Sequence, residues 1–133
     1  NSDIGKKSLE KINTQNNINI QDLKKKEKIL KDLEIEIASK KKIISKEAFE
    51  KEVITFRKNI DQFKIEQQQI IKDFNDYKKK EIDKVFQTIS PIINSYMEQK
   101  SVKILFDAKN IFMARNDLNL TNDILEAINK EAK

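Results

Sequence analysis

The stretch from Phe49 to Tyr77 reads FEKEVITFRKNIDQFKIEQQQIIKDFNDY and has a large apolar side chain at every seventh position. This first series consists of Phe49, Phe56, Phe63, Ile70 and Tyr77. A second series lies four residues after members of the first and consists of Val53, Ile60 and Phe74, with Gln67 in the remaining slot. Alternate spacings of four and three are typical of a coiled-coil seam, because 3.5 residues per turn keep these positions on one face. The stretch therefore predicts a long helix packed against a partner helix.

The predicted partner is the preceding part of the same chain. A seven-residue series upstream consists of Leu9, Asn16, Leu23, Leu30, Ile37 and Ile44. A companion series three residues later consists of Ile12, Asn19, Lys26, Leu33 and Lys40. If the chain folds back near residue 46, the two halves meet in pairs whose numbers add to 93, such as Ile37 with Phe56. One register shared by five apolar layers predicts a long antiparallel helical hairpin.

Polar residues mark the ends of the two predicted helices. Ser2 or Asp3 is expected to cap the first helix, which runs to about Lys42. Ser45 is expected to cap the second helix, which runs to about Gln99. Between them the hairpin has a tight tip.

The seam pattern shifts after Tyr77. The apolar positions that continue it are Ile82, Val85 or Phe86, Ile89, Ile93 and Tyr96. Such a stutter locally unwinds a supercoil. Pro91 lies inside this pattern, and proline normally ends or kinks a helix.

The period changes again after Lys100. Alternating residues predict a strand over 102–106 and a second strand over 111–114, followed by a short helix that Thr121 caps. The fold class is thus mainly α with a small β part, in which residues 1–100 form an arm and 101–133 a β body. A two-stranded sheet is marginal alone, so several chains are expected to combine their tails. The predicted oligomer interface consists of Val102, Ile104, Phe106 and Ile111.

Composition narrows the possible chemistry and partners. The chain has no Cys and no His, which excludes thiolate and imidazole sites, and no catalytic residue, metal site or cofactor is predicted. The net charge of +5 suits nucleic acid, anionic lipid or an acidic protein client. Because 25 of the 27 basic residues are Lys, specific nucleic-acid readout is not expected, whereas weak contact with an anionic membrane surface stays open.

Three segments of the tail resemble the C-terminal part of the Skp/OmpH-like periplasmic chaperones. They are ILFD at 104–107, IFMA at 111–114 and LTNDIL at 120–125, and the head NSDIGKK at 1–7 is similar to the family's entry into its first long helix. The resemblance implies a jellyfish-like homotrimer in the periplasm that holds unfolded outer-membrane β-barrel proteins without ATP. The family has a β-strand before its first helix, and this sequence starts after that point, which leaves trimerisation of these 133 residues open.

Client contacts are expected from apolar side chains that the hairpin seam does not use. Heptad counting places two isoleucines opposite the seam and four on its flanks. These predicted client-binding residues are Ile29, Ile35, Ile43, Ile54, Ile65 and Ile71. The alternative function is a coiled-coil scaffold or adaptor that holds no client.

Overall fold

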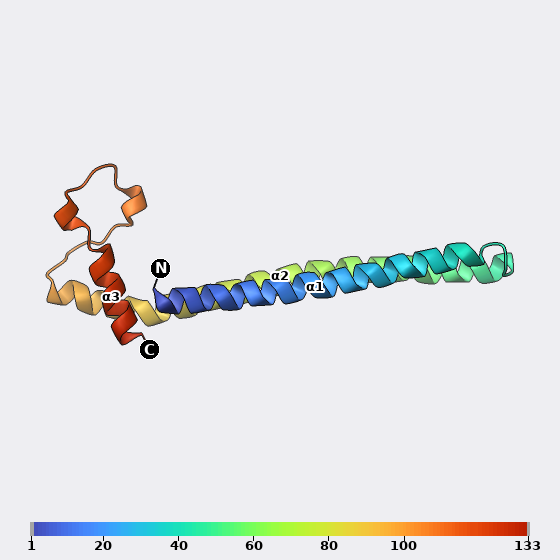
Figure 1. Cartoon of the computed structure of the whole chain (residues 1–133), viewed down its shortest axis with the longest axis horizontal. Coiled ribbons are helices and arrows are strands. Elements are labelled where there is room, and N and C mark those ends of the chain that lie inside the picture. Colours follow the sequence, from blue (N-terminus) through green and yellow to red (C-terminus); the bar gives the residue numbers. More distant parts are fainter. Residues whose placement is uncertain (1, 133) are drawn as a thin grey trace. The chain divides into compact units, whose positions relative to one another are not determined.

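A computed structural model describes residues 2–132, so Asn1 and Lys133, the outer ends of the predicted arm and body, lie outside the described residues. The described chain is mainly helical (Figure 1). Its elements are α1 (Asp3–Lys40), α2 (Lys46–Gln99), the 3-10 helices η1 (Ala108–Asn110) and η2 (Asn116–Leu118), and α3 (Thr121–Glu131). The chain divides into two compact units, one of residues 13–77 and one of residues 1–12 with 78–133.

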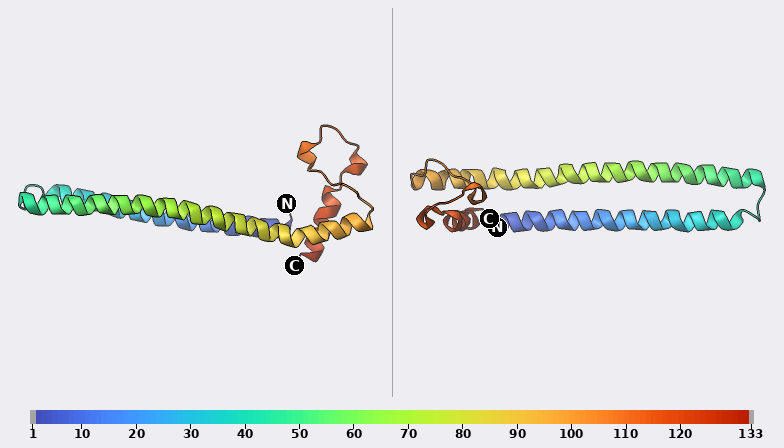
Figure 2. Two further views of the ribbon diagram at one scale, coloured as in Figure 1. Left: turned by 180° about the vertical axis from the view of Figure 1, so that it is seen from behind. Right: turned by 90° about the horizontal axis from the view of Figure 1, so that it is seen from above.

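In the unit of residues 13–77, α1 and α2 lie side by side and run antiparallel (Figures 1 and 2). Ile37 is 7% exposed, and Phe56, with which it was predicted to pair, is half-buried. Two ion pairs join the helices, one between Lys26 Nζ and Glu66 Oε2 at 2.5 Å and one between Lys40 Nζ and Glu52 Oε2 at 3.3 Å. In each ion pair the two residue numbers add to 92, whereas the numbers of residues paired across the seam were predicted to add to 93. The ion pairs thus join residues directly beside the predicted seam pairs. These contacts agree with the predicted register.

The tip is closed by backbone bonds and a serine cap. α1 ends at Lys40, two residues earlier than predicted, because the N–H groups of Ile43 and Ile44 both donate to the Lys40 carbonyl, at 2.8 and 3.1 Å. The cap predicted at Ser45 is confirmed, since its Oγ accepts a hydrogen bond from the Ala48 N–H at 3.2 Å.

In the unit of residues 1–12 with 78–133, α3 bonds to both long helices. The Asp3 N–H donates to Asn129 Oδ1 at 2.8 Å, and the Tyr96 hydroxyl donates to Asp123 Oδ2 at 3.2 Å. Ile128 of α3 is 4% exposed and is the one buried apolar residue among the described residues of this unit. Ser2, one of two candidates, caps α1, because its Oγ accepts from the Gly5 N–H at 3.3 Å.

One of two further predictions about helix ends was wrong. Thr121 is the first residue of α3 and not its cap, which is Leu120, without a side-chain hydrogen bond. The predicted end of α2 is confirmed, since the helix continues through Pro91 to Gln99. Proline lacks the N–H that would donate to the Gln87 carbonyl, and the loss of this one bond does not end the helix.

The predicted seam was wrong at Leu9 and at Ile82, whereas Val85, offered as an alternative to Phe86, is half-buried as predicted. Ser8 is buried, and its Oγ donates to the Glu81 carbonyl at 3.3 Å. Leu9, Ile82 and Phe86 are exposed instead. Tyr77, Glu81 and Val85 follow one another at intervals of four residues, and each interval turns the packing face of α2 by only about 40°. The predicted interval of five residues, from Tyr77 to Ile82, would turn it by about 140°. The helix therefore packs through Glu81 and the half-buried Val85.

The tail forms no strand between residues 101 and 120, all of which the structure describes. The predicted strands at 102–106 and 111–114 are irregular, and the turn between them is η1, where Asp107 Oδ1 accepts from the Lys109 N–H at 3.0 Å. A two-stranded ladder lacks the third partner and covered face that would stabilise it. The predicted β part is thus not found within residues 2–132.

Candidate functional site

The hairpin of residues 13–77 exposes a set of isoleucines on both long helices. The six predicted client-binding residues Ile29, Ile35, Ile43, Ile54, Ile65 and Ile71 are 54–79% exposed. The prediction that they lie outside the seam is therefore confirmed. Ile18 and Ile20 are exposed as well, and heptad counting would have found them, since each is one or two residues from a seam asparagine. Single exposed apolar residues are ordinary, but eight on one hairpin are a dispersed apolar surface.

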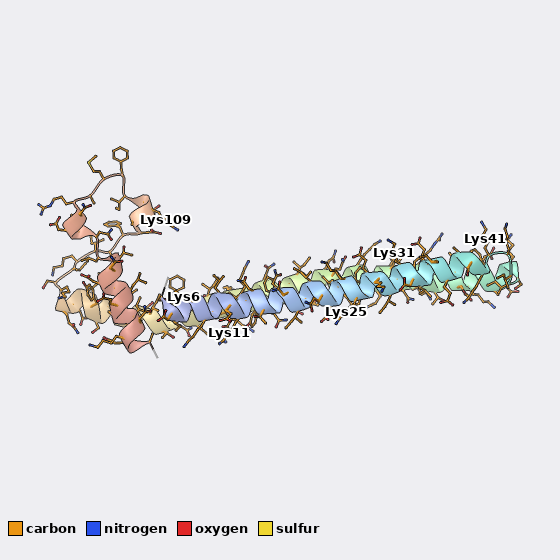
Figure 3. All side chains as sticks on the ribbon, in the orientation of Figure 1. Lys6, Lys11, Lys25, Lys31, Lys41 and Lys109 are labelled. Carbon is orange, nitrogen blue, oxygen red and sulfur yellow. The ribbon has the colours of Figure 1, made fainter. Side chains whose placement is uncertain are left out.

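Lysines surround these isoleucines. Figure 3 shows lysine side chains such as Lys31 and Lys41 projecting away from the long helices. Within the described residues, no ion pair within 4.0 Å involves Lys31, Lys41 or Lys42, so their charges face solvent. By contrast, hydrogen bonds to Glu36 and Glu52 raise the pKa of Lys40.

The lysines in ion pairs help to hold the hairpin. The hydrogen bond from Lys26 lowers the pKa of Glu66, which keeps this interhelical pair charged well below neutral pH. Exposed pairs contribute little to stability each, and their partners remain accessible. Residues 13–77 contain 14 basic and 12 acidic residues. The surface of the hairpin is therefore apolar at scattered points and of mixed charge between them.

The tail presents a second apolar surface. Of the predicted interface residues, Ile104, Phe106 and Ile111 are exposed and Val102 is half-buried. The sequence prediction missed Phe112, which is fully exposed, and Met113. Both residues lie in the predicted second strand next to Ile111, and this position could have identified them as part of the interface. A soluble chain rarely exposes so many large apolar side chains within ten residues unless another surface covers them.

Nothing in the described residues resembles a reaction centre. Residues 2–132 contain no group of three or more acidic side chains that is placed to hold a metal ion. Asp73, for example, is exposed and accepts a hydrogen bond from Gln69 Nε2 at 2.7 Å. Among these residues, no helix has a run apolar and long enough to cross a bilayer.

Comparison with known proteins identifies one family. The family model described as "Outer membrane protein (OmpH-like)" matches residues 1–128. Searches of curated proteins and of solved structures gave no match.

Proposed function

Because this chain belongs to the OmpH-like family, whose members are periplasmic chaperones, we propose that it is an ATP-independent holdase for unfolded outer-membrane proteins in the periplasm. The family is not enzymatic, and the proposal requires no cofactor. The observation that carries it is the exposure of the six isoleucines between solvent-facing lysines.

In this proposal the client protein is held by many weak contacts with the exposed isoleucines. An unfolded chain that covers part of one exposed isoleucine gains roughly 1 kcal/mol or less, well below the value of a full side-chain burial. Six such contacts on one hairpin retain a client without selecting one sequence. Exposed lysines raise the encounter rate with acidic clients, and this part of the attraction weakens with salt. The same lysines permit weak contact with an anionic membrane surface.

The tail is proposed to join copies of the chain. Val102, Ile104, Phe106 and Ile111 would pack against other copies in a homotrimer, in which the extended segments find strand partners that one chain lacks. In this proposal residues 1–100 serve as an arm and residues 101–133 as an oligomerising body. Several arms in one particle would multiply the weak client contacts.

An aggregation-suppression assay with an unfolded outer-membrane β-barrel protein tests the function. The parent protein should reduce light scattering, whereas a scaffold without client-holding activity would leave it unchanged. Ser at all six isoleucines should weaken holding at least about tenfold, which corresponds to about 1.4 kcal/mol, with helix content unaltered. Ser at a single position should have little effect.

A matched control replaces six exposed polar residues of the same helices with Ser. Suitable positions are Asn13, Asn17, Gln21, Asn59, Gln68 and Asn75. This control should hold the client as well as the parent does. If the six-isoleucine variant does so too, the isoleucines are not the client surface.

A further inference from the structure

The base of the hairpin exposes three large apolar residues, of which the sequence pattern places Leu9 and Ile82 in the seam and offers Phe86 there as an alternative to Val85. Leu9 is 52% exposed, Ile82 41% and Phe86 59%. The places of Leu9 and Ile82 in the packed face are taken by Ser8 and Glu81, which are buried and joined by the hydrogen bond from Ser8 Oγ to the Glu81 carbonyl. Polar groups thus pack inside while apolar ones face water, an inversion that calls for a functional explanation.

The three residues lie on one side of the hairpin. Leu9 follows Ser8, and Ile82 follows Glu81, by one residue, or about 100° of rotation. Because the two helices are antiparallel at this contact, the two rotations turn both side chains to the same side. Phe86 lies one turn after Ile82 on the same helix face. The patch is therefore continuous across α1 and α2.

A glycine lies next to this patch. Gly5, the only glycine of the chain, lies one turn before Leu9 on the same face of α1. Its φ is not positive, so the backbone does not require glycine here. A Cβ would approach Ser2 Oγ at 3.2 Å, close to the cap of α1. The absent side chain thus leaves room for the Ser2 side chain, which caps α1 beside the patch.

The charges around the patch favour an acidic partner. Lys78 and Lys79 lie one turn before Ile82, and Asp83 lies one turn before Phe86, so cations are in excess. Among the described residues neither lysine has an oppositely charged group within 4.0 Å. An incoming carboxylate would thus meet two accessible ammonium groups next to the apolar side chains.

We propose that Leu9, Ile82 and Phe86 form a client subsite at the base of the hairpin, which binds an unfolded segment carrying a large apolar side chain beside a carboxylate. The subsite rests on the proposed holdase function and is separate from the six isoleucines of residues 13–77. Phe86 is its central residue, because an aromatic ring offers the largest contact area of the three.

A tryptophan probe tests this subsite directly, because the chain has no native Trp. In Phe86→Trp, fluorescence should move to shorter wavelength when an unfolded β-barrel client without Trp is added. The control is Gln87→Trp, an exposed neighbour about 100° further round α2, whose emission should not change. If Phe86→Trp shows no shift while still suppressing aggregation, the subsite is wrong. If the parent suppresses no aggregation, both the holdase function and the subsite are wrong.

Affinity gives a second readout. Ser at Leu9, Ile82 and Phe86 together should raise the client Kd about tenfold, and circular dichroism should be unchanged because all three are exposed. Lys78→Glu should raise the Kd for an acidic client, whereas Lys78→Arg should preserve it. An unchanged Kd in the triple variant would overturn the proposal.

Discussion

Glu81 is a buried carboxylate whose charge is kept by two lysines. It is 6% exposed, and Lys84 Nζ lies 2.6 Å from its Oε1. The hydrogen bond from Lys84, together with the positive charges of Lys84 and Lys11, lowers the pKa of Glu81 below its ordinary value of 4.5 against the opposing effect of burial. A lowered folded-state pKa stabilises the fold above that ordinary value, and this contribution is lost as pH falls through the folded pKa.

We therefore expect Glu81→Gln to destabilise the protein at neutral pH and to reduce the loss of stability between about pH 5 and pH 3. Urea unfolding midpoints at the two ends of this range measure the effect. Glu10→Gln, at an exposed position of α1, is the control and should retain the parent's pH dependence. The same pH dependence in parent and Glu81→Gln would contradict the role of the buried charge.

Ser101 has a backbone conformation that favours glycine. Its φ is 54°, at the end of α2, where the Val102 N–H donates to the Met97 carbonyl at 2.9 Å and the Ser101 N–H to the Glu98 carbonyl at 3.2 Å. These two bonds form a Schellman motif, in which glycine usually occupies the left-handed position. Ser101→Gly should stabilise the protein by about 1 kcal/mol, because it relieves the contact between Cβ and the backbone.

Thermal unfolding checks the Ser101→Gly prediction as a rise of a few degrees in Tm. Ser95→Gly, within α2, should instead lower stability by about 0.5 kcal/mol or more, because glycine weakens a helix interior. Equal effects of the two substitutions would show that the left-handed conformation is not strained.

At the scale of elements, the seam between α1 and α2 sets which residues face each other. Ile37 and Phe56 belong to one predicted layer, whereas Phe63 lies in the next layer, about 10 Å further along α2. In a double-mutant cycle, Ile37→Ala and Phe56→Ala should couple by about 1 kcal/mol, since neighbours are not additive. Ile37→Ala and Phe63→Ala should be nearly additive. The reverse result would mean that the helices pair in another register.

At the scale of the whole molecule, exposed tail residues determine the expected assembly. Phe106 is 66% exposed and is not part of the hairpin seam. Phe106→Asp should abolish the proposed trimer, because a buried unpaired carboxylate is costly, and should leave helix content largely intact. Mass by light scattering measures this in the full-length protein. Lys103→Asp, at another exposed position of the same segment, should still assemble, and a stable trimer of Phe106→Asp would refute the interface.

Much of the fold and of the arm surface could be predicted from the sequence. The seven-residue series fixed the pairing of residues 23–70, because only one register buries all the apolar layers of that segment at once. The exposure of the six isoleucines followed from the same counting. Ser2 and Ser45 were identifiable as caps because a short hydroxyl side chain satisfies the free N–H groups that begin a helix.

Tertiary contacts decided the rest. Heptad counting placed Leu9 and Ile82 inside, but the helices pack through Ser8 and Glu81, because a packing face can turn only gradually along a rigid helix. The attachment of α3, through Asn129 and Tyr96, had no local signal, since its partners are distant in sequence. The alternating residues of the tail favour a strand, but they do not form one, because a strand exists only when another backbone pairs with it.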